Sequence, residues 1–170
     1  MSDTPHRLAT RLAALFQRLA EHQVDAYLVL SADAHLNEYV PIYQRRRAAI
    51  TGFTGSAGDA LLCPEGSHLF VDSRYYLQAD QEVDPAYFRV HKLGMEGAHT
   101  LTGWLTEMER QRGSLRVSFD PSFVSRTSQP SAEIRSRSSS LRFQFFWRRA
   151  FSRCCASCAT SSGMAASVSA

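Results

Sequence analysis

The first apolar pattern along the chain is a stripe of large side chains at three- and four-residue spacing, which predicts an amphipathic helix. The stripe consists of Leu8, Leu12, Leu15, Phe16 and Leu19. Thr4 and Pro5 precede it, a pair typical of an N-cap and a first helical position. We therefore expect a helix that begins at Pro5 and buries one face.

Short apolar runs follow and predict β-strands, because each is bounded by turn residues. They cover residues 26–30, 59–63, 68–72, 88–91 and 116–120. The first run is apolar on both faces, as in a strand covered by helices on each side. The intervening segments predict helices, one over residues 73–83 and one over residues 100–112 that ends at Gly113. This alternation indicates an α/β domain with a mixed β-sheet flanked by helices.

The composition changes abruptly near residue 122 of the 170-residue chain. Residues 1–121 hold 12 Lys and Arg against 15 Asp and Glu, whereas residues 122–170 hold seven Arg and a single acid, Glu133. The second part also contains 14 serines and three of the four cysteines. It shows no clear helical or strand period, so we expect a domain over residues 1–122 and an irregular or disordered tail over residues 123–170. An out-of-frame reading of a longer gene would produce the same jump.

Two further interpretations of the tail are weaker. Its arginines and aromatic residues would suit nucleic acid, through phosphate contacts and base stacking, but a solvated Ser/Arg segment is the simpler interpretation and we expect no nucleic-acid partner. Cys155 and Cys158 form a lone CxxC with no later histidine, short of the four ligands of structural zinc. No apolar run approaches the ~20 residues of a membrane span, and no secretory signal is evident, so we expect a cytoplasmic protein without a membrane partner.

Asp33, His35 and Glu38 lie within six residues, and each can bind a metal or move a proton. They would suit a small stand-alone hydrolase if they converged in a cleft. A catalytic zinc site, however, requires three rigidly held ligands, and this spacing on one loop is not an established one. Asp33 could equally cap a turn, and Glu38 could pair with an arginine of residues 45–47. We therefore expect no metal site here.

Gly52, Gly55 and Gly58 recur at three-residue spacing, as in a loop that cradles phosphate. No Lys-Ser/Thr follows them, as a P-loop requires, and the spacing is not that of the dinucleotide fingerprint. A backbone path that needs positive φ, or a close approach to a neighbour, explains them more simply.

Arg74 stands at the start of a predicted helix beside Tyr75 and Tyr76. Its planar guanidinium could reach a substrate carboxylate or carbonyl through a forked hydrogen bond. An ion pair with Asp72 or Asp80 is the alternative, and composition alone does not separate the two.

Taken together, the stretches SADAHLNEYVPIYQRRRAAITGFTGSAG, VDSRYYLQAD and GWL resemble the creatinase-type N-terminal domain of Xaa-Pro aminopeptidases, the aminopeptidase P family. The likeness covers about residues 5 to 125 and is greatest to the longer, cytosolic three-domain type. Ser73 stands where the family usually has Gly, and Thr51 where it often has Ser. The resemblance implies an α/β unit with a layout like that of ribonuclease H.

The resemblance also implies a function. Family enzymes remove an N-terminal residue that precedes proline, using two metal ions, usually manganese, in a C-terminal domain that supplies the ligands. Their N-terminal domain supports oligomers, so a homodimer is possible, and it restricts access to the cleft. The arginine of the family's D-G-R-Y stretch reaches the peptide substrate, which assigns substrate binding to Arg74. This sequence offers no position for the metal ligands, so we expect no catalytic residue, no cofactor and no hydrolysis by this chain alone.

Overall fold

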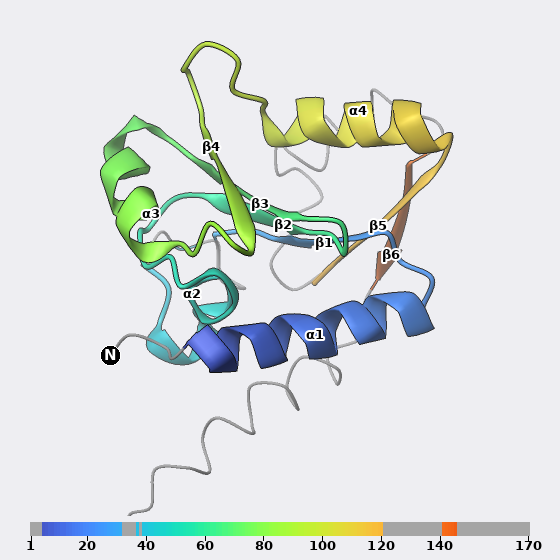
Figure 1. Ribbon diagram of the computed structural model, residues 1–170, viewed down its shortest axis with the longest axis horizontal. Helices are drawn as coiled ribbons and strands as arrows, with labels where there is room; N and C mark the ends of the chain where they lie inside the picture. The colour runs from blue at the N-terminus through green and yellow to red at the C-terminus, as the bar shows by residue number, and fades with distance from the viewer. Residues whose placement is uncertain (1–4, 32–36, 38, 121–140, 146–170) are drawn as a thin grey trace, which may run out of the picture.

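A six-stranded mixed sheet forms the centre of the molecule, in the order β4-β3-β2-β1-β5-β6 (Figure 1). The computed structural model describes residues 5–31, 37, 39–120 and 141–145. The strands are β1 (Ala26–Val29), β2 (Asp59–Leu62), β3 (Ser67–Val71), β4 (Phe88–Lys92), β5 (Leu115–Phe119) and β6 (Leu141–Phe145). The helices are α1 (Pro5–Glu21), α2 (Arg46–Thr51), α3 (Tyr76–Glu82) and α4 (Leu101–Arg112), with short 3₁₀ turns η1 (Ile42–Gln44) and η2 (Ser73–Tyr75).

The strand directions make the sheet mixed, as predicted. β1 runs antiparallel to β2 and parallel to β5, and β3 runs antiparallel to β2 and parallel to β4. The parallel pair β3 and β4 needs a crossover, which η2 and α3 supply. The predicted α/β class is therefore confirmed, and each predicted helix and strand occurs within a few residues of its expected limits.

The sequence patterns missed two elements, α2 and β6. α2 is only six residues long, too short for a visible helical period. β6 pairs in parallel with β5, so residues 141–145 form a strand within the segment for which no strand was predicted. The signal was present, because the sequence LRFQF alternates apolar and polar residues as a strand does. The arginine- and serine-rich composition around it obscured that pattern.

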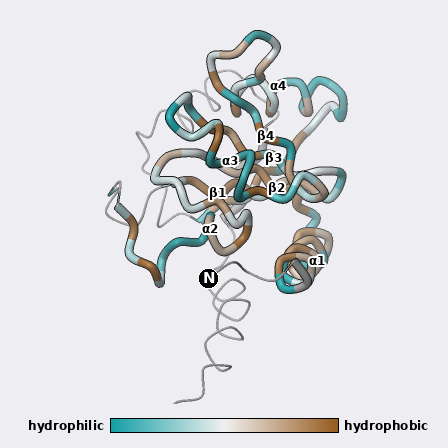
Figure 2. Tube along the Cα trace, turned by 60° about the vertical axis from the view of Figure 1, so that its left-hand side comes forward, coloured by the Kyte–Doolittle hydropathy of each residue, from teal (hydrophilic) through white to brown (hydrophobic). Residues whose placement is uncertain are grey.

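Helices cover both faces of the sheet (Figure 1). The leucines of α1 pack with Ile50 of α2 and Ala79 of α3 on one face, while Leu101, Leu105 and Met108 of α4 pack on the other. Figure 2 shows the hydrophobic stretches gathered where the strands cross the centre. Each leucine side chain removed from water contributes about 1.5–3 kcal/mol to folding, so these two layers account for much of the domain's stability.

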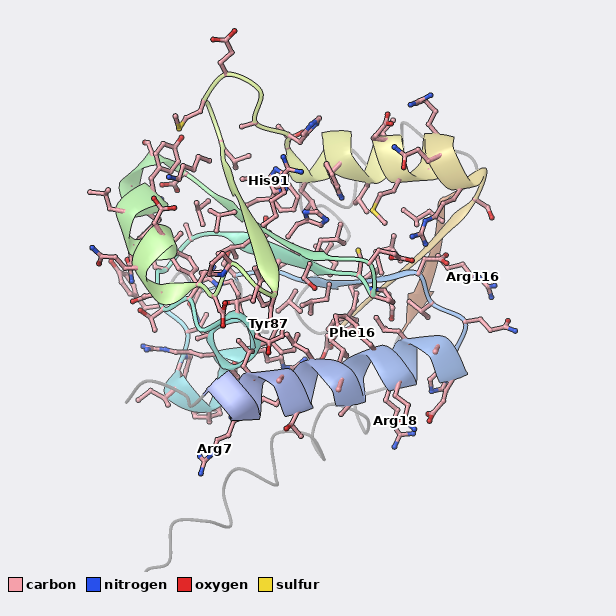
Figure 3. All side chains as sticks on the ribbon, viewed as in Figure 1. Arg7, Phe16, Arg18, Tyr87, His91 and Arg116 are labelled. Carbon is pink, nitrogen blue, oxygen red and sulfur yellow. The ribbon has the colours of Figure 1, made fainter. Side chains whose placement is uncertain are left out.

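The orientation of α1 follows from its stripe. Phe16 points toward the sheet, whereas Arg7 and Arg18 point away from it (Figure 3). All four leucines of the stripe, from Leu8 to Leu19, are buried. Pro5 is the first residue of the helix, as expected; the predicted N-cap, Thr4, lies outside the described residues. The amphipathic pattern therefore fixed which face meets the core.

Candidate functional site

Arg74 is held in place by the aspartate two residues before it. Asp72 caps η2, accepting a hydrogen bond from the backbone N–H of Arg74 at 3.0 Å. The guanidinium donates to both carboxylate oxygens, from Nε to Oδ1 at 3.1 Å and from Nη2 to Oδ2 at 2.8 Å. These hydrogen bonds hold the pKa of Asp72 below its usual value. Of the two predicted ion-pair partners, Asp72 is the one found, because Asp80 pairs with Lys92 instead.

The Arg74 side chain remains accessible to a ligand despite that pair. It is 62% exposed, and its guanidinium lies 5.3 Å from the ring centroid of Tyr75. A guanidinium that a carboxylate and an aromatic ring already orient loses little conformational freedom when it binds a further hydrogen-bond acceptor. This geometry is compatible with substrate contact, which stays a prediction.

The glycine loop over residues 52–58 is organised around a buried cation. Arg47 of α2 is 8% exposed and donates from Nη2 to the carbonyl of Gly55 and from Nη1 to the carbonyl of Gly58. A phosphate cradle points N–H groups inward, whereas here two carbonyls point at a guanidinium. The simpler interpretation of the glycines therefore fits this loop. A Cβ on Gly55 would lie 2.3 Å from Cζ of Phe53, and Gly58 has φ of +140°.

Burial disfavours the charged forms of two residues at the base of this loop, Arg47 and Asp59. Burial lowers the pKa of Arg47, and the same cause raises the pKa of Asp59, which the charge of Arg47 partly offsets. Ser31 donates from its backbone N and from Oγ to Oδ1 of Asp59, each at 3.3 Å, and accepts from the N–H of Gly58 at 3.3 Å. The first residue of the SADAHLNEY stretch is thus bonded to the glycine loop.

Tyr75 joins the glycine loop to the segment that carries Arg74. Its hydroxyl lies 2.6 Å from Oγ of Ser56, and its ring meets Phe53 edge to face with centroids 5.8 Å apart. Thr54 adds two hydrogen bonds to the carboxylate of Glu82, each 2.7 Å long. A shift of the loop would therefore be passed to α3 and to Arg74.

A hollow of ≈ 200 Å³ lies beside the loop, lined by Ser31, Tyr39, Arg45–Arg47 and Thr54–Ser56 among others. Arg74 does not line it. Arg46 pairs with Asp120, and Arg45 donates to the carbonyl of Val40 at 2.9 Å. Arg47 donates to the carbonyls of Gly55 and Gly58. Each of the three arginines that were predicted as partners of Glu38 thus bonds another group.

Several predicted site residues lie outside the described residues. They are Asp33, His35, Glu38 and the three tail cysteines. Within the described part of the chain, no group of three or more His, Cys, Asp or Glu is placed to hold a metal ion. No described helix is long and apolar enough to cross a membrane.

Sequence reasoning missed the roles of Arg47 and Glu82. A signal for Arg47 existed, because Arg47, Ile50 and Thr51 lie at the i, i+3 and i+4 positions of one helix face, all buried. For Glu82 we find no sequence signal, since its partner Thr54 is 28 residues away.

The mixed sheet, with helices on both of its faces, defines an α/β domain. Residues 11–135 match the family model of the Creatinase/Prolidase N-terminal domain. The chain therefore belongs to that family.

Known relatives point to one enzyme class. A probable Xaa-Pro aminopeptidase P of Neosartorya fischeri is 38% identical over 123 residues, which are 72% of this chain and 18% of that protein. Its counterpart in Penicillium rubens is 39% identical over 114 residues, 67% of this chain and 18% of that protein. The chain thus spans about a fifth of the length of these curated relatives.

Solved structures agree on the fold. The X-prolyl aminopeptidase of Caenorhabditis elegans, a cytosolic enzyme with a di-nuclear active site, superposes with a TM-score of 0.72 and 26% identity over 82% of this chain and 24% of that one. The N-terminal domain of a putative metallopeptidase from Corynebacterium diphtheriae gives 0.56 at 20% identity, over 83% of this chain and 98% of that one. The second likeness supports the fold alone.

Proposed function

We propose that this chain acts as the N-terminal domain of a cytoplasmic, metal-dependent Xaa-Pro aminopeptidase and supplies Arg74 to a peptide with proline at its second position. The observation that carries the proposal is the exposed guanidinium of Arg74, fixed by Asp72 beside the glycine loop. An arginine keeps its proton at any working pH. Its role would be to orient a peptide carbonyl or carboxylate, and not to transfer protons.

The metal chemistry of this proposal belongs to another domain. The C. elegans enzyme has a di-nuclear active site, and this chain matches 24% of it. We assign two metal ions, manganese by the family resemblance, to a catalytic domain that would work beside this one. Such a pair activates a bridging water for attack on the scissile carbonyl. The chain alone would then be inactive and limited to homodimer formation or to control of substrate access.

A turnover assay tests the first part of the proposal. The purified chain is incubated with Mn²⁺ and an Xaa-Pro dipeptide, and release of the N-terminal residue is measured. The expected result is no release above that of a blank without protein. Clear turnover that requires Mn²⁺ would show that the chain carries its own catalytic site.

A chimera tests the role of Arg74. The segment of the C. elegans enzyme that matches this chain is replaced by residues of this chain, and Arg74→Ala is compared with Arg7→Ala on the outer face of α1. Loss of one charge-assisted hydrogen bond, about 1.5–3 kcal/mol, should raise KM about tenfold or more for Arg74→Ala. Metal content should not change. Equal kinetics of the two variants would remove substrate binding from Arg74.

A further inference from the structure

β4 is an edge strand, and one of its sides has no neighbouring strand in the described sheet. Its inner side pairs in parallel with β3, with Leu69 opposite Val90 and Val71 opposite Lys92. Edge strands present unpaired N–H and C=O groups and are templates for another extended segment. The question is which groups of β4 are presented, and to what.

The alternation of backbone hydrogen bonds along β4 shows which of its N–H and C=O groups face outward. The N–H of Leu93 bonds the carbonyl of Val71 on β3, so the odd-numbered residues 89, 91 and 93 direct their backbone groups toward β3. The even-numbered residues direct theirs outward, and the N–H of Phe88 accordingly bonds Asp84 on the outer side. Both backbone groups of Val90 therefore face away from the sheet, and no described residue bonds them.

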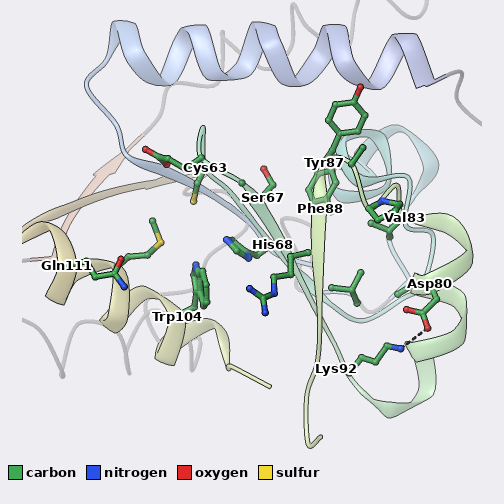
Figure 4. Close-up of a pocket in the computed structure, with 18 of the residues that line it drawn as sticks. Cys63, Ser67, His68, Asp80, Val83, Tyr87, Phe88, Lys92, Trp104 and Gln111 are labelled. Carbon is green, nitrogen blue, oxygen red and sulfur yellow. Dashed lines mark hydrogen bonds and ion pairs between the residues drawn. The ribbon is translucent and has the colours of Figure 1, made fainter. Parts of the chain in front are cut away.

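A hollow of ≈ 840 Å³ runs along this edge, between α3 and α4 (Figure 4). Its ionised lining residues are Glu65, Asp80, Arg89, Lys92 and Arg112. Lys92 pairs with Asp80 at 2.6 Å and Arg112 with Glu65 at 2.7 Å. No described residue pairs with Arg89, which is exposed. The hollow therefore has one cation in excess, in the middle of the edge.

The two sides of β4 differ in chemistry. Phe88 and Val90 face the layer of α1 and α3, where Val83 and Pro85 also line the hollow. His91 faces α4, where its ring centroid lies 5.3 Å from that of Trp104, and Arg89 shares that side because it is two residues away. A strand laid beside β4 would thus meet an apolar wall on one side and a cation on the other.

We propose that the outer edge of β4 binds an extended acidic peptide as an additional strand. Its backbone pairs with the N–H and C=O of Val90, its acidic side chains lie on the side of Arg89, and its small apolar side chains lie against Val83 and Pro85. This is strand addition, in which backbone bonds give affinity and alternate side chains give specificity. The site is separate from the Arg74 loop and does not depend on the proposed function.

The excess positive charge favours an acidic peptide over a second copy of the chain as the occupant of the β4 edge. Pairing two β4 edges would bring two Arg89 side chains together, which is unfavourable. An acidic strand neutralises Arg89 instead. Charged residues on an edge also discourage edge-to-edge association, so the same arginine that repels a copy can select an acidic partner.

Binding of a defined peptide to the full chain tests the proposal. The probe is fluorescein-labelled Glu-Val-Glu-Val-Glu with blocked ends, and Lys-Val-Lys-Val-Lys is its charge-reversed control. Arg89→Glu should weaken binding about tenfold or more, the effect of one lost charge-assisted hydrogen bond. Val90→Pro removes an outward N–H without removing a bond to β3 and should abolish binding. Arg7→Glu carries the same charge change on α1 and should have no effect.

A second measurement does not depend on any variant's folding. In the unchanged chain, the acidic peptide should slow hydrogen exchange of the Val90 amide. The proposal is overturned if the acidic peptide does not bind, if Arg7→Glu weakens it as much as Arg89→Glu, or if exchange at Val90 is unaffected. Self-association of the chain that Val90→Pro abolishes would assign the edge to a second copy and also overturn it.

Discussion

Replacing Arg47 by methionine should destabilise the domain by about 3 kcal/mol. Methionine keeps an unbranched apolar side chain, although a shorter one, and donates no hydrogen bond. The carbonyls of Gly55 and Gly58 would lose their donors, and each buried acceptor left without a partner costs about 1–3 kcal/mol. Gly58 is only partly buried, so water recovers part of its cost. The midpoint of thermal unfolding should fall by about 10 °C for a domain of this size.

The pH dependence of this variant gives a sharper test. Burial raises the pKa of Asp59, and Arg47 opposes that rise, so Arg47→Met should raise this pKa further. A carboxyl whose pKa is higher in the folded state binds its proton more tightly there, so stability falls as pH rises through that range. The deficit of Arg47→Met should therefore be largest near neutral pH and should shrink toward pH ~4. Asp59→Asn in both backgrounds should remove the difference.

Urea unfolding followed by circular dichroism measures these free energies. Arg7→Met, on the exposed face of α1 (Figure 3), is the matched control and should change stability by less than about 0.5 kcal/mol. A loss below about 1 kcal/mol for Arg47→Met would refute the view that this cation organises the loop. So would a deficit that does not depend on pH or on Asp59.

Three further outcomes can be checked by the same unfolding measurements. Gly55→Ala should cost about 1–3 kcal/mol, because the new Cβ would lie 2.3 Å from the buried ring of Phe53. Nδ1 of His68 and Nε2 of His91 lie 3.0 Å apart, and burial lowers the pKa of each histidine to about 4. Stability should therefore fall as pH drops from 6.5 toward 4, because the unfolded chain binds these protons more tightly. His68→Gln should reduce this dependence of stability on pH, and an unchanged dependence would contradict the role given to the histidine pair. Thr100→Ala should cost about 1 kcal/mol, since the Thr100 hydroxyl caps α4 by accepting from the N–H of Gly103, and a change near zero would mean that this cap contributes nothing.

Local sequence patterns were sufficient to predict most of the fold. The leucine stripe of α1 predicted a helix and its buried face, and short apolar runs predicted five of the six strands. Gly113 was recognised as a helix limit because capping depends on residues close in sequence. The family motifs identified the domain in the same way, as short stretches read in order.

The sequence by itself thus determined most of the helices and strands, the buried face of α1 and the family to which the chain belongs. Only the tertiary structure decided which partner each polar group finds. Arg47 could have paired with Glu38, and it holds the carbonyls of Gly55 and Gly58 instead. The tertiary structure also placed β4 at the edge of the described sheet, where no described residue bonds the backbone of Val90 or pairs with Arg89. Periodicity reports burial within a few residues, whereas pairing depends on distances between segments that only the folded chain brings together.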